Sequence, residues 1–256
     1  MRGFAVFFVK ELRELLRTKR LLILCCLFLL FGIMNPAVAK LTPKLIGLMS
    51  EELAAQGMTV SAVTVTSMDS WVQFEKNIPF ALIILLIMFS GIYTFEYSRG
   101  TLIPLLTKGL SRAAAVLSKC AVVMLMWTGG LALCFGLTYF YGDFYWDNSA
   151  VHSLFFAGFC WWLFGLLMIG CVVFFSSFAA SSAQVLLGTG AVYFVMLLAG
   201  MYGRAKAYLP TRLCDSLSLF RGDLHPSDYT AAAVVTAALT AALILAALPL
   251  TKQRQI

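Results

Sequence analysis

Six long apolar runs constrain the fold of this chain more than any other feature of its sequence. A helix needs about 20 mostly apolar residues to cross a bilayer, because the hydrocarbon core is about 30 Å thick and each helical residue rises about 1.5 Å. Charged residues make up 12% of the 256 residues, about half the share found in soluble domains, so no sizeable soluble domain is expected. The sequence predicts an all-α polytopic membrane protein with six transmembrane helices, near residues 21–39, 78–95, 113–139, 151–178, 185–202 and 231–250.

The distribution of charge predicts the orientation of these helices. With the N-terminus inside, 12 of the 19 Lys and Arg residues fall on the cytoplasmic side, as expected when basic residues near the span ends set the orientation. Only three acidic residues, Glu11, Glu14 and Glu96, share that side. We therefore expect a multi-pass protein of the cell (cytoplasmic or inner) membrane with both termini in the cytoplasm. No small-residue cleavage site precedes Lys40, which favours a retained first helix over a signal peptide.

Residues 1–20, ahead of the first span, have a different pattern. At about 100° per residue, apolar side chains between Phe4 and Leu16 gather on one face, and basic side chains gather on the opposite face. This predicts a cytoplasmic amphipathic helix lying in the membrane plane, with its basic side toward anionic headgroups. The helix is either a surface anchor or a lever that also contacts a partner. Its assigned residues are Phe4, Phe8, Lys10, Glu11, Leu12, Arg13 and Arg17.

Two outer segments are long enough to form structure of their own. Residues 40–77 carry leucines at helical spacing, followed by Trp71 and Phe74, which we expect near the membrane surface. Residues 203–230 mix apolar and charged side chains. Both segments predict interfacial helices that cover the outer end of the bundle.

Several kinds of chemistry lack the residues they need. No ionisable side chain lies near the centre of a predicted span, which disfavours a proton-driven carrier or an ion channel. The chain contains no GxxxxGK[ST] loop to hold ATP. Its two histidines, His152 and His225, lie at or outside the outer surface, and six of its seven cysteines fall within predicted spans as small hydrophobes. We assign no catalytic residue and no metal ligand, and we expect no nucleic-acid binding, since the basic residues form no stripe with interleaved aromatics.

The triplet Asn35-Pro36-Ala37 resembles the signature of water channels, but those channels need two such triplets meeting at the midplane, and the chain has one. Pro36 lies at the outer end of the first apolar run, where proline commonly ends a helix. We therefore interpret Pro36 as the end of the first transmembrane helix.

The segment after the second predicted span carries the functional interpretation. Residues 96–112 read EYSRGTLIPLLTKGLSR. Helical spacing gathers the leucines into one stripe, and Gly100 followed by Thr101 supplies a break and an N-cap. The segment therefore predicts a short amphipathic helix near residues 99–112, on the cytoplasmic side between the second and third spans.

This segment resembles the permease subunits of type-2 ATP-binding-cassette (ABC) exporters. Their pattern is a Glu at the end of the second span, then Gly-Thr-Leu, Leu-Leu, Thr and Ser-Arg, with a Lys in the third span. The chain departs from it at Gly109, where the family often has proline, and at Pro104, which is an additional break. The matching residues are Glu96, Gly100, Thr101, Leu102, Leu105, Leu106, Thr107, Ser111, Arg112 and Lys119.

The resemblance implies that the short helix is a coupling helix, which sits in a groove of a separate cytoplasmic ATPase. Leucines would supply apolar contact, and basic residues would meet acidic or polar groups of the ATPase. The coupling residues implied are Glu96, Arg99, Gly100, Thr101, Leu102, Leu105, Leu106, Thr107, Lys108, Ser111 and Arg112.

The resemblance also implies the partners of the chain. These are two copies of an ABC ATPase subunit, a second permease copy or a paralogue, and membrane lipid. ATP and Mg would be held by the ATPase, with no cofactor and no enzymatic activity in this chain.

The leading interpretation is therefore the permease subunit of an ATP-driven exporter that moves a hydrophobic or amphipathic cargo such as a drug, a peptide or a lipid. Two alternatives stay open, namely an autonomous channel or facilitative carrier and a membrane immunity or scaffold protein. The sequence leaves open the cargo and the choice between homodimer and heterodimer.

Overall fold

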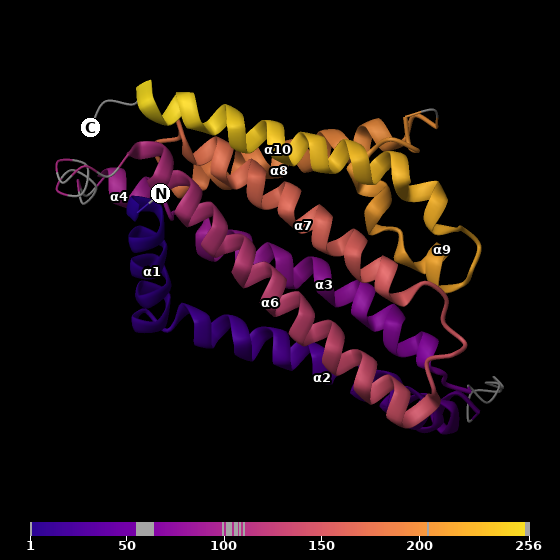
Figure 1. Ribbon diagram of the computed structural model, residues 1–256. Coiled ribbons are helices and arrows are strands. Elements are labelled where there is room, and N and C mark those ends of the chain that lie inside the picture. Colours follow the sequence, from indigo (N-terminus) through magenta and orange to yellow (C-terminus); the bar gives the residue numbers. More distant parts are fainter. Residues whose placement is uncertain are drawn as a thin grey trace.

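The computed structural model describes residues 2–54, 64–98, 100, 104, 107, 109, 111–203 and 205–253, and these residues contain helices and turns but no strand. Within this part of the chain, six helices are long and apolar enough to cross a membrane, which confirms the predicted fold class. They form an elongated bundle with both chain ends at the same end (Figure 1). The six are α2 (Arg20–Ala54), α3 (Ser67–Phe89), α6 (Arg112–Trp146), α7 (Leu154–Ser176), α8 (Ser182–Gly200) and α10 (Thr230–Gln253).

The helix α1 (Arg2–Arg17) precedes these spans and crosses the end of the bundle at a steep angle to α2 (Figure 1). The corner between the two helices is tight. Lys19 adopts the left-handed conformation with φ 57°, which an L-residue rarely occupies, and the Thr18 hydroxyl donates to the Glu14 carbonyl over 2.8 Å. After α3, a turn leads into the short helix α4 (Thr94–Ser98) at this same end.

The interpretation of Pro36 as a helix end is wrong, because α2 continues through Pro36 and Pro43 to Ala54. Proline has no N–H, so the carbonyl of Gly32 loses its helical donor at Pro36. The Thr138 hydroxyl of α6 lies 3.5 Å from that carbonyl, and Asn35, which is fully buried, donates to Thr138 Oγ1 over 2.9 Å. Spanning helices tolerate proline where side chains of neighbouring helices satisfy the freed groups.

The segment 40–77 also differs from expectation. Its first part extends α2 rather than forming a separate helix, and α3 begins at Ser67, eleven residues before the predicted span. Trp71 and Phe74 are fully buried in the core, where they face neighbouring helices. Trp71 packs on Phe135 with ring centroids 5.0 Å apart and donates from Nε1 to Asn148 Oδ1 over 3.0 Å. This buried partner for the indole N–H, supplied by the α6–α7 turn, allows the ring to enter the core.

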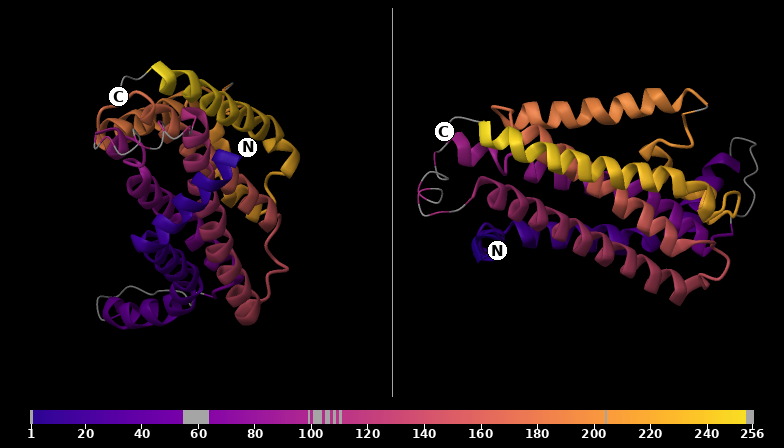
Figure 2. Two further views of the ribbon diagram at one scale, coloured as in Figure 1. Left: turned by 60° about the vertical axis from the view of Figure 1, so that its left-hand side comes forward. Right: turned by 45° about the horizontal axis from the view of Figure 1, so that its top comes forward.

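The second outer segment folds into the bundle rather than forming one interfacial helix. It contains three short helices, η1 (Pro210–Cys214), α9 (Ser216–Phe220) and η2 (Pro226–Tyr229). The two prolines start new turns because their φ angle suits the first position of a helix. Phe220 is buried, in a helix that contacts α3 and α7, and Trp161 of α7 donates to the Ser216 hydroxyl over 2.9 Å. The segment therefore closes the end of the bundle opposite α1 (Figures 1 and 2).

Two glycines allow aromatic rings to lie directly against a neighbouring helix in the middle of the bundle. A Cβ atom at Gly130 of α6 would lie 2.2 Å from the Phe28 ring of α2. A Cβ atom at Gly165 of α7 would lie 2.2 Å from the Trp127 ring of α6. The close approach of α2 to α6 and of α6 to α7 therefore depends on the absence of a side chain at these two positions.

We predict that the polar contacts joining α2, α3 and α6 stabilise the bundle. Asn77 Nδ2 donates to Asn35 Oδ1 over 2.7 Å, so Asn35→Ala removes this bond and the bond to Thr138. We expect the free energy of unfolding to fall by about 0.5–2 kcal/mol, measured by denaturant titration in mixed micelles. A double-mutant cycle with Asn77→Ala should give a coupling energy of about 0.6 kcal/mol or more. Cys25→Ala, at an exposed position on α2, is the control, and strict additivity of the two Asn variants would contradict the prediction.

Candidate functional site

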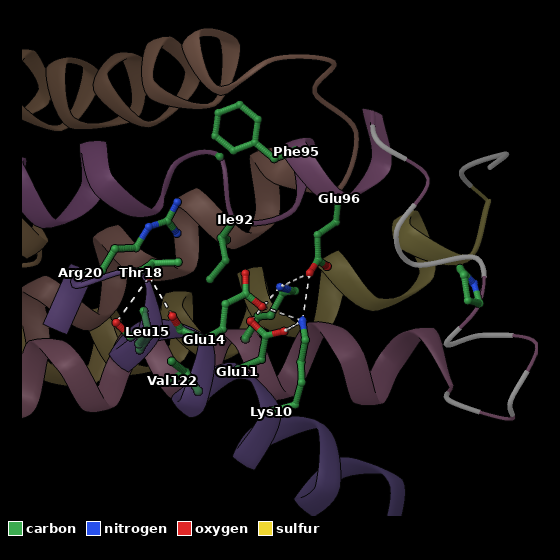
Figure 3. A pocket seen from close by; sticks show the side chains of 13 residues that line it. Lys10, Glu11, Glu14, Leu15, Thr18, Arg20, Ile92, Phe95, Glu96 and Val122 are labelled. Carbon is green, nitrogen blue, oxygen red and sulfur yellow. Dashed lines mark hydrogen bonds and ion pairs between the residues drawn. The ribbon is translucent and has the colours of Figure 1, made fainter.

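A cluster of five charged residues lies where α1 crosses the end of α3 and the start of α6. We call Lys10, Glu11, Glu14, Glu96 and Lys119 the ion-pair cluster. Lys10, Glu11 and Glu14 come from α1, Glu96 from α4 and Lys119 from the third turn of α6. Their charged groups point toward one another beside a cavity (Figure 3). The cluster thus joins the predicted interfacial helix to Glu96, the first of the predicted coupling residues.

The packed face of α1 differs from the predicted apolar face. The buried residues are Phe7, Glu11 and Leu15, spaced four apart, and they face the bundle. Phe8, Lys10 and Leu12 are half-buried at the edges of this face. Phe4, Val9 and Leu16, which belong to the predicted apolar face, have exposed side chains. The basic side chains of Arg13 and Arg17 are exposed as well. A carboxylate occupies the packed face because α6 supplies a buried ammonium group to meet it.

Lys119 lies at the centre of the ion-pair cluster. Its Nζ is 2.8 Å from Glu11 Oε2 and 3.0 Å from Glu96 Oε1. Lys10 Nζ lies 2.8 Å from both Glu11 Oε1 and Glu14 Oε2, and 3.4 Å from Glu96 Oε1. Glu11 and Glu96 each therefore contact both ammonium groups, and the three elements α1, α4 and α6 are joined by ionic contacts.

Burial makes these contacts energetically important. The side chain of Lys119 is 2% exposed and that of Glu11 is 5% exposed. A buried charge is tolerated only when an opposite charge and hydrogen bonds compensate for lost water. The Phe7 and Tyr93 rings also lie near the Lys119 ammonium, with centroids 5.6 and 5.9 Å away, and aromatic faces attract cations. Removal of either partner would leave an uncompensated charge inside the protein.

The outer part of the ion-pair cluster stays charged over a wide pH range. Burial opposes the charged form of Lys10, but hydrogen bonds to Glu11 and Glu14 outweigh burial and raise its pKa above the usual value. Burial opposes ionisation of Glu14, but the hydrogen bond from Lys10 lowers its pKa below the usual value. The stability due to the Glu14 pair is therefore present above the usual pKa of Glu and is lost as pH falls through the lowered value. The raised pKa of Lys10 keeps the pair intact until strongly alkaline pH.

The three carboxylates could in principle share a cation. Oxygen atoms of Glu11, Glu14 and Glu96 lie within 4.8 Å of one another. However, Lys10 and Lys119 already place two ammonium groups on them. The three carboxylates therefore form an ion-pair network, in which the two ammonium groups supply the positive charge that a metal ion would otherwise supply.

The predicted coupling residues divide into two groups. Arg99, Thr101, Leu102, Leu105, Leu106 and Lys108 lie outside the described residues. Among the others, Gly100 has φ 65°, in keeping with the predicted break, and the Thr107 hydroxyl donates to the Pro104 carbonyl over 3.1 Å. Ser111 caps α6 by accepting from the Ala114 N–H over 3.2 Å.

Arg112 has a contact that differs from its predicted role. Its guanidinium donates to the Thr251 carbonyl of α10 over 3.2 Å. The start of α6 is thereby tied to the last spanning helix. The family resemblance predicts that Arg112 meets a partner, whereas this bond uses one of its donors within the chain.

Sequence reasoning missed part of the ion-pair cluster. Lys119 matches a family position but is not among the predicted site residues, and neither are Glu14, Phe7 and Tyr93. One signal was present, because the only three acidic residues predicted on the cytoplasmic side, Glu11, Glu14 and Glu96, are those that meet here. The i,i+4 spacing of Lys10 and Glu14 was a second signal.

Comparison with known protein families identifies a match that covers most of the chain. Residues 5–213 match the family described as ABC-2 family transporter protein. This range covers most of α1, the ion-pair cluster and the spans α2, α3, α6, α7 and α8. No curated protein and no solved structure has significant similarity to the chain.

We predict that Lys119→Met strongly destabilises the protein. Glu11 and Glu96 would lose the buried ammonium between them, which costs about 3–5 kcal/mol in the free energy of unfolding. Adding Glu11→Gln replaces the more buried of these two carboxylates and should recover more than half of the loss. Lys10→Met, at a side chain that is 41% exposed, should cost about 1 kcal/mol or less. Equal losses for Lys119→Met and Lys10→Met in thermal or denaturant unfolding would contradict this assignment.

Proposed function

The chain belongs to the ABC-2 family of transporter proteins, and on this basis we propose that it is the transmembrane permease subunit of an ATP-driven exporter. The family consists of membrane transport subunits and implies pairing with an ABC ATPase. In this proposal the ATPase is a separate chain that binds and hydrolyses ATP with Mg²⁺. The present chain is then non-catalytic and provides the path for a hydrophobic or amphipathic cargo.

The ion-pair cluster is the observation that carries the proposal. The predicted coupling segment is connected at one side to α4 and at the other to α6. Glu96 of α4 and Lys119 of α6 are 3.0 Å apart, and both contact α1 through Lys10 or Glu11. A displacement of the segment by an ATPase would therefore be passed to α3, α6 and α1 together, as in switches that move packed helices as units.

The proposed orientation places this end of the bundle in the cytoplasm of a cell. The basic side chains of Arg13 and Arg17 are exposed on α1, and basic residues near span ends favour the cytoplasmic side. Both termini share this end (Figure 1). The proposed location is the cytoplasmic or inner membrane, with both termini and the coupling segment facing the ATPase.

An apolar groove supports the proposed cargo class. It has a volume of about 270 Å³ and lies between α3, α7 and α8. Its walls include Leu82 of α3, Trp161 and Met168 of α7, and Tyr193 of α8. Such a surface suits a ligand that is largely apolar with one polar end. The groove therefore fits a drug, lipid or hydrophobic peptide better than a sugar polymer.

We further propose a complex of two permease chains and two ATPases. The spanning part of α8 is 17% buried within the chain, the lowest share among the six spans. The side chains of Leu187, Phe194 and Val195 of α8 are exposed, which gives an apolar surface against which another helix could pack. A second copy or a paralogue placed against α8 would complete the transport path.

We predict that the tagged chain, purified from its native membrane in mild detergent, carries an ATPase with it. Replacing Leu105 and Leu106 together with Asp should abolish this recovery, because two charges would enter the apolar contact with the ATPase groove. Tyr208→Asp, at an exposed residue of the opposite end, is the control and should leave recovery unchanged.

Recovery of the chain alone, together with cargo flux through liposomes that contain no ATPase, would instead indicate an autonomous channel or carrier. In that case the coupling assignment of the segment 99–112 is wrong.

A separate prediction concerns transmission rather than ATPase binding. The double variant Lys119→Met/Glu11→Gln keeps the coupling segment but removes the central contact between α1 and α6. We expect normal ATPase recovery and at least about a five-fold loss of ATP-dependent transport in proteoliposomes, which corresponds to a coupling energy of about 1 kcal/mol. Arg13→Gln, exposed on α1 and outside the ion-pair cluster, should transport normally. Unchanged transport in the double variant would show that the cluster is only a structural anchor.

A further inference from the structure

The cavity beside the ion-pair cluster is built from two unlike walls. Its volume is about 620 Å³, within the range of about 300–1,000 Å³ typical of ligand sites. Glu14, Thr18 and Arg20 form one wall at the corner between α1 and α2, and Leu15, Ile92 and Phe95 contribute the apolar part (Figure 3). A ligand of this cavity needs both a charged and an apolar portion.

The charges around the cavity are unequally placed. Within the described residues, the ion-pair cluster joins three carboxylates to two ammonium groups, and the carboxylate of Glu14 contacts the ammonium of Lys10 alone. A further cation, Arg20, lies on the cavity wall at the first residue of α2. Among the described residues no ion pair joins Arg20 to a carboxylate, although its charge acts on Glu14. The cavity thus presents a cation and a half-exposed carboxylate on the wall at the corner between α1 and α2.

The cavity lies beside exposed apolar side chains of α1 and α2. The helix α1 crosses the ends of the spans (Figure 1) and exposes Val9 and Leu16 on its flank, as a helix at the membrane interface does. Soon after Arg20, the exposed side chains of Leu22 and Ile23 begin the lipid-facing surface of α2. An acyl chain could follow this surface from a headgroup held at Arg20.

We propose that this cavity holds the headgroup of a phospholipid with a primary ammonium, such as phosphatidylethanolamine. The guanidinium of Arg20 binds the phosphate, for which its planar fork of N–H groups is suited. The ammonium faces Glu14, whose side chain is 49% exposed and has lone pairs beyond the one used by Lys10. Phosphatidylcholine lacks N–H donors for Glu14, and phosphatidylglycerol lacks the positive charge that the carboxylate of Glu14 attracts.

Native mass spectrometry of the purified full chain tests this site. The protein is exchanged into micelles that contain equal small amounts of phosphatidylethanolamine, phosphatidylcholine and phosphatidylglycerol, and the retained lipids are compared. We expect phosphatidylethanolamine to be preferred. Arg20→Gln should lower its retention about ten-fold, since a charge-assisted hydrogen bond is lost, and Arg20→Lys should give an intermediate value. Glu14→Gln should lower the preference over phosphatidylcholine while leaving phosphatidylcholine retention unchanged.

Matched controls and a soluble headgroup complete the design. Arg221→Gln, exposed at the opposite end of the bundle and outside this cavity, should retain lipid like the unaltered chain. Glycerophosphoethanolamine, which has the headgroup without acyl chains, should compete poorly. Equal retention in Arg20→Gln and Arg221→Gln, no preference among the three lipids, or full competition by the soluble headgroup would each overturn the proposal. The proposal does not depend on the transport function, because ATPase recovery is expected to be the same in Arg20→Gln and the unaltered chain.

Discussion

The buried ammonium group of Lys119 between two carboxylates fixes the arrangement of one whole end of this molecule. An isolated charge at 2% exposure would be far too costly, so the elements that carry its partners are held in place. Glu11 draws α1 across the bundle end, and Glu96 holds α4 beside the start of α6. The tight corner at Lys19 then connects α1 to α2 without a flexible linker. One cation thereby sets the relative positions of α1, α4 and α6.

The two halves of the bundle are held by different kinds of polar interaction. The end with α1 uses full charges, whereas the contacts between spans further along the bundle use neutral amides and hydroxyls. Asn35, Asn77 and Thr138 join three spans there, and Asn148 receives the indole N–H of Trp71. Neutral bonds of this kind are modest in strength. The charged end is therefore the one that responds most to the electrostatic environment, including lipid headgroups and a protein partner.

Hydropathy alone predicted the number and order of the spanning helices, because the length of an apolar run is set by the bilayer and not by tertiary contacts. The helix ends were harder to predict, since they depend on contacts across the fold. Pro36 does not end α2 because Asn35 and Thr138 stabilise the chain around it, and neither contact has a local signature. The burial of Trp71 depends on its partner Asn148, 77 residues away. For the site, the family pattern and the amphipathic period located Glu11 and Glu96, but the pairing through Lys119 required the three-dimensional packing of α1 on α6.

The two glycine contacts in the middle of the bundle restrict how the protein can move. The Phe28 ring rests on Gly130, and the Trp127 ring rests on Gly165, so α2, α6 and α7 are interlocked at successive points. Sliding one of these helices along the next would drive a ring into the side chain beyond the glycine. The three helices therefore have few independent degrees of freedom and behave as one rigid body. The Phe175 ring of α7 lies in the same way against Gly188 of α8, where a Cβ atom would be 2.6 Å from it, so α8 is interlocked with this block as well. A displacement that reaches α6 would therefore move the interlocked helices together.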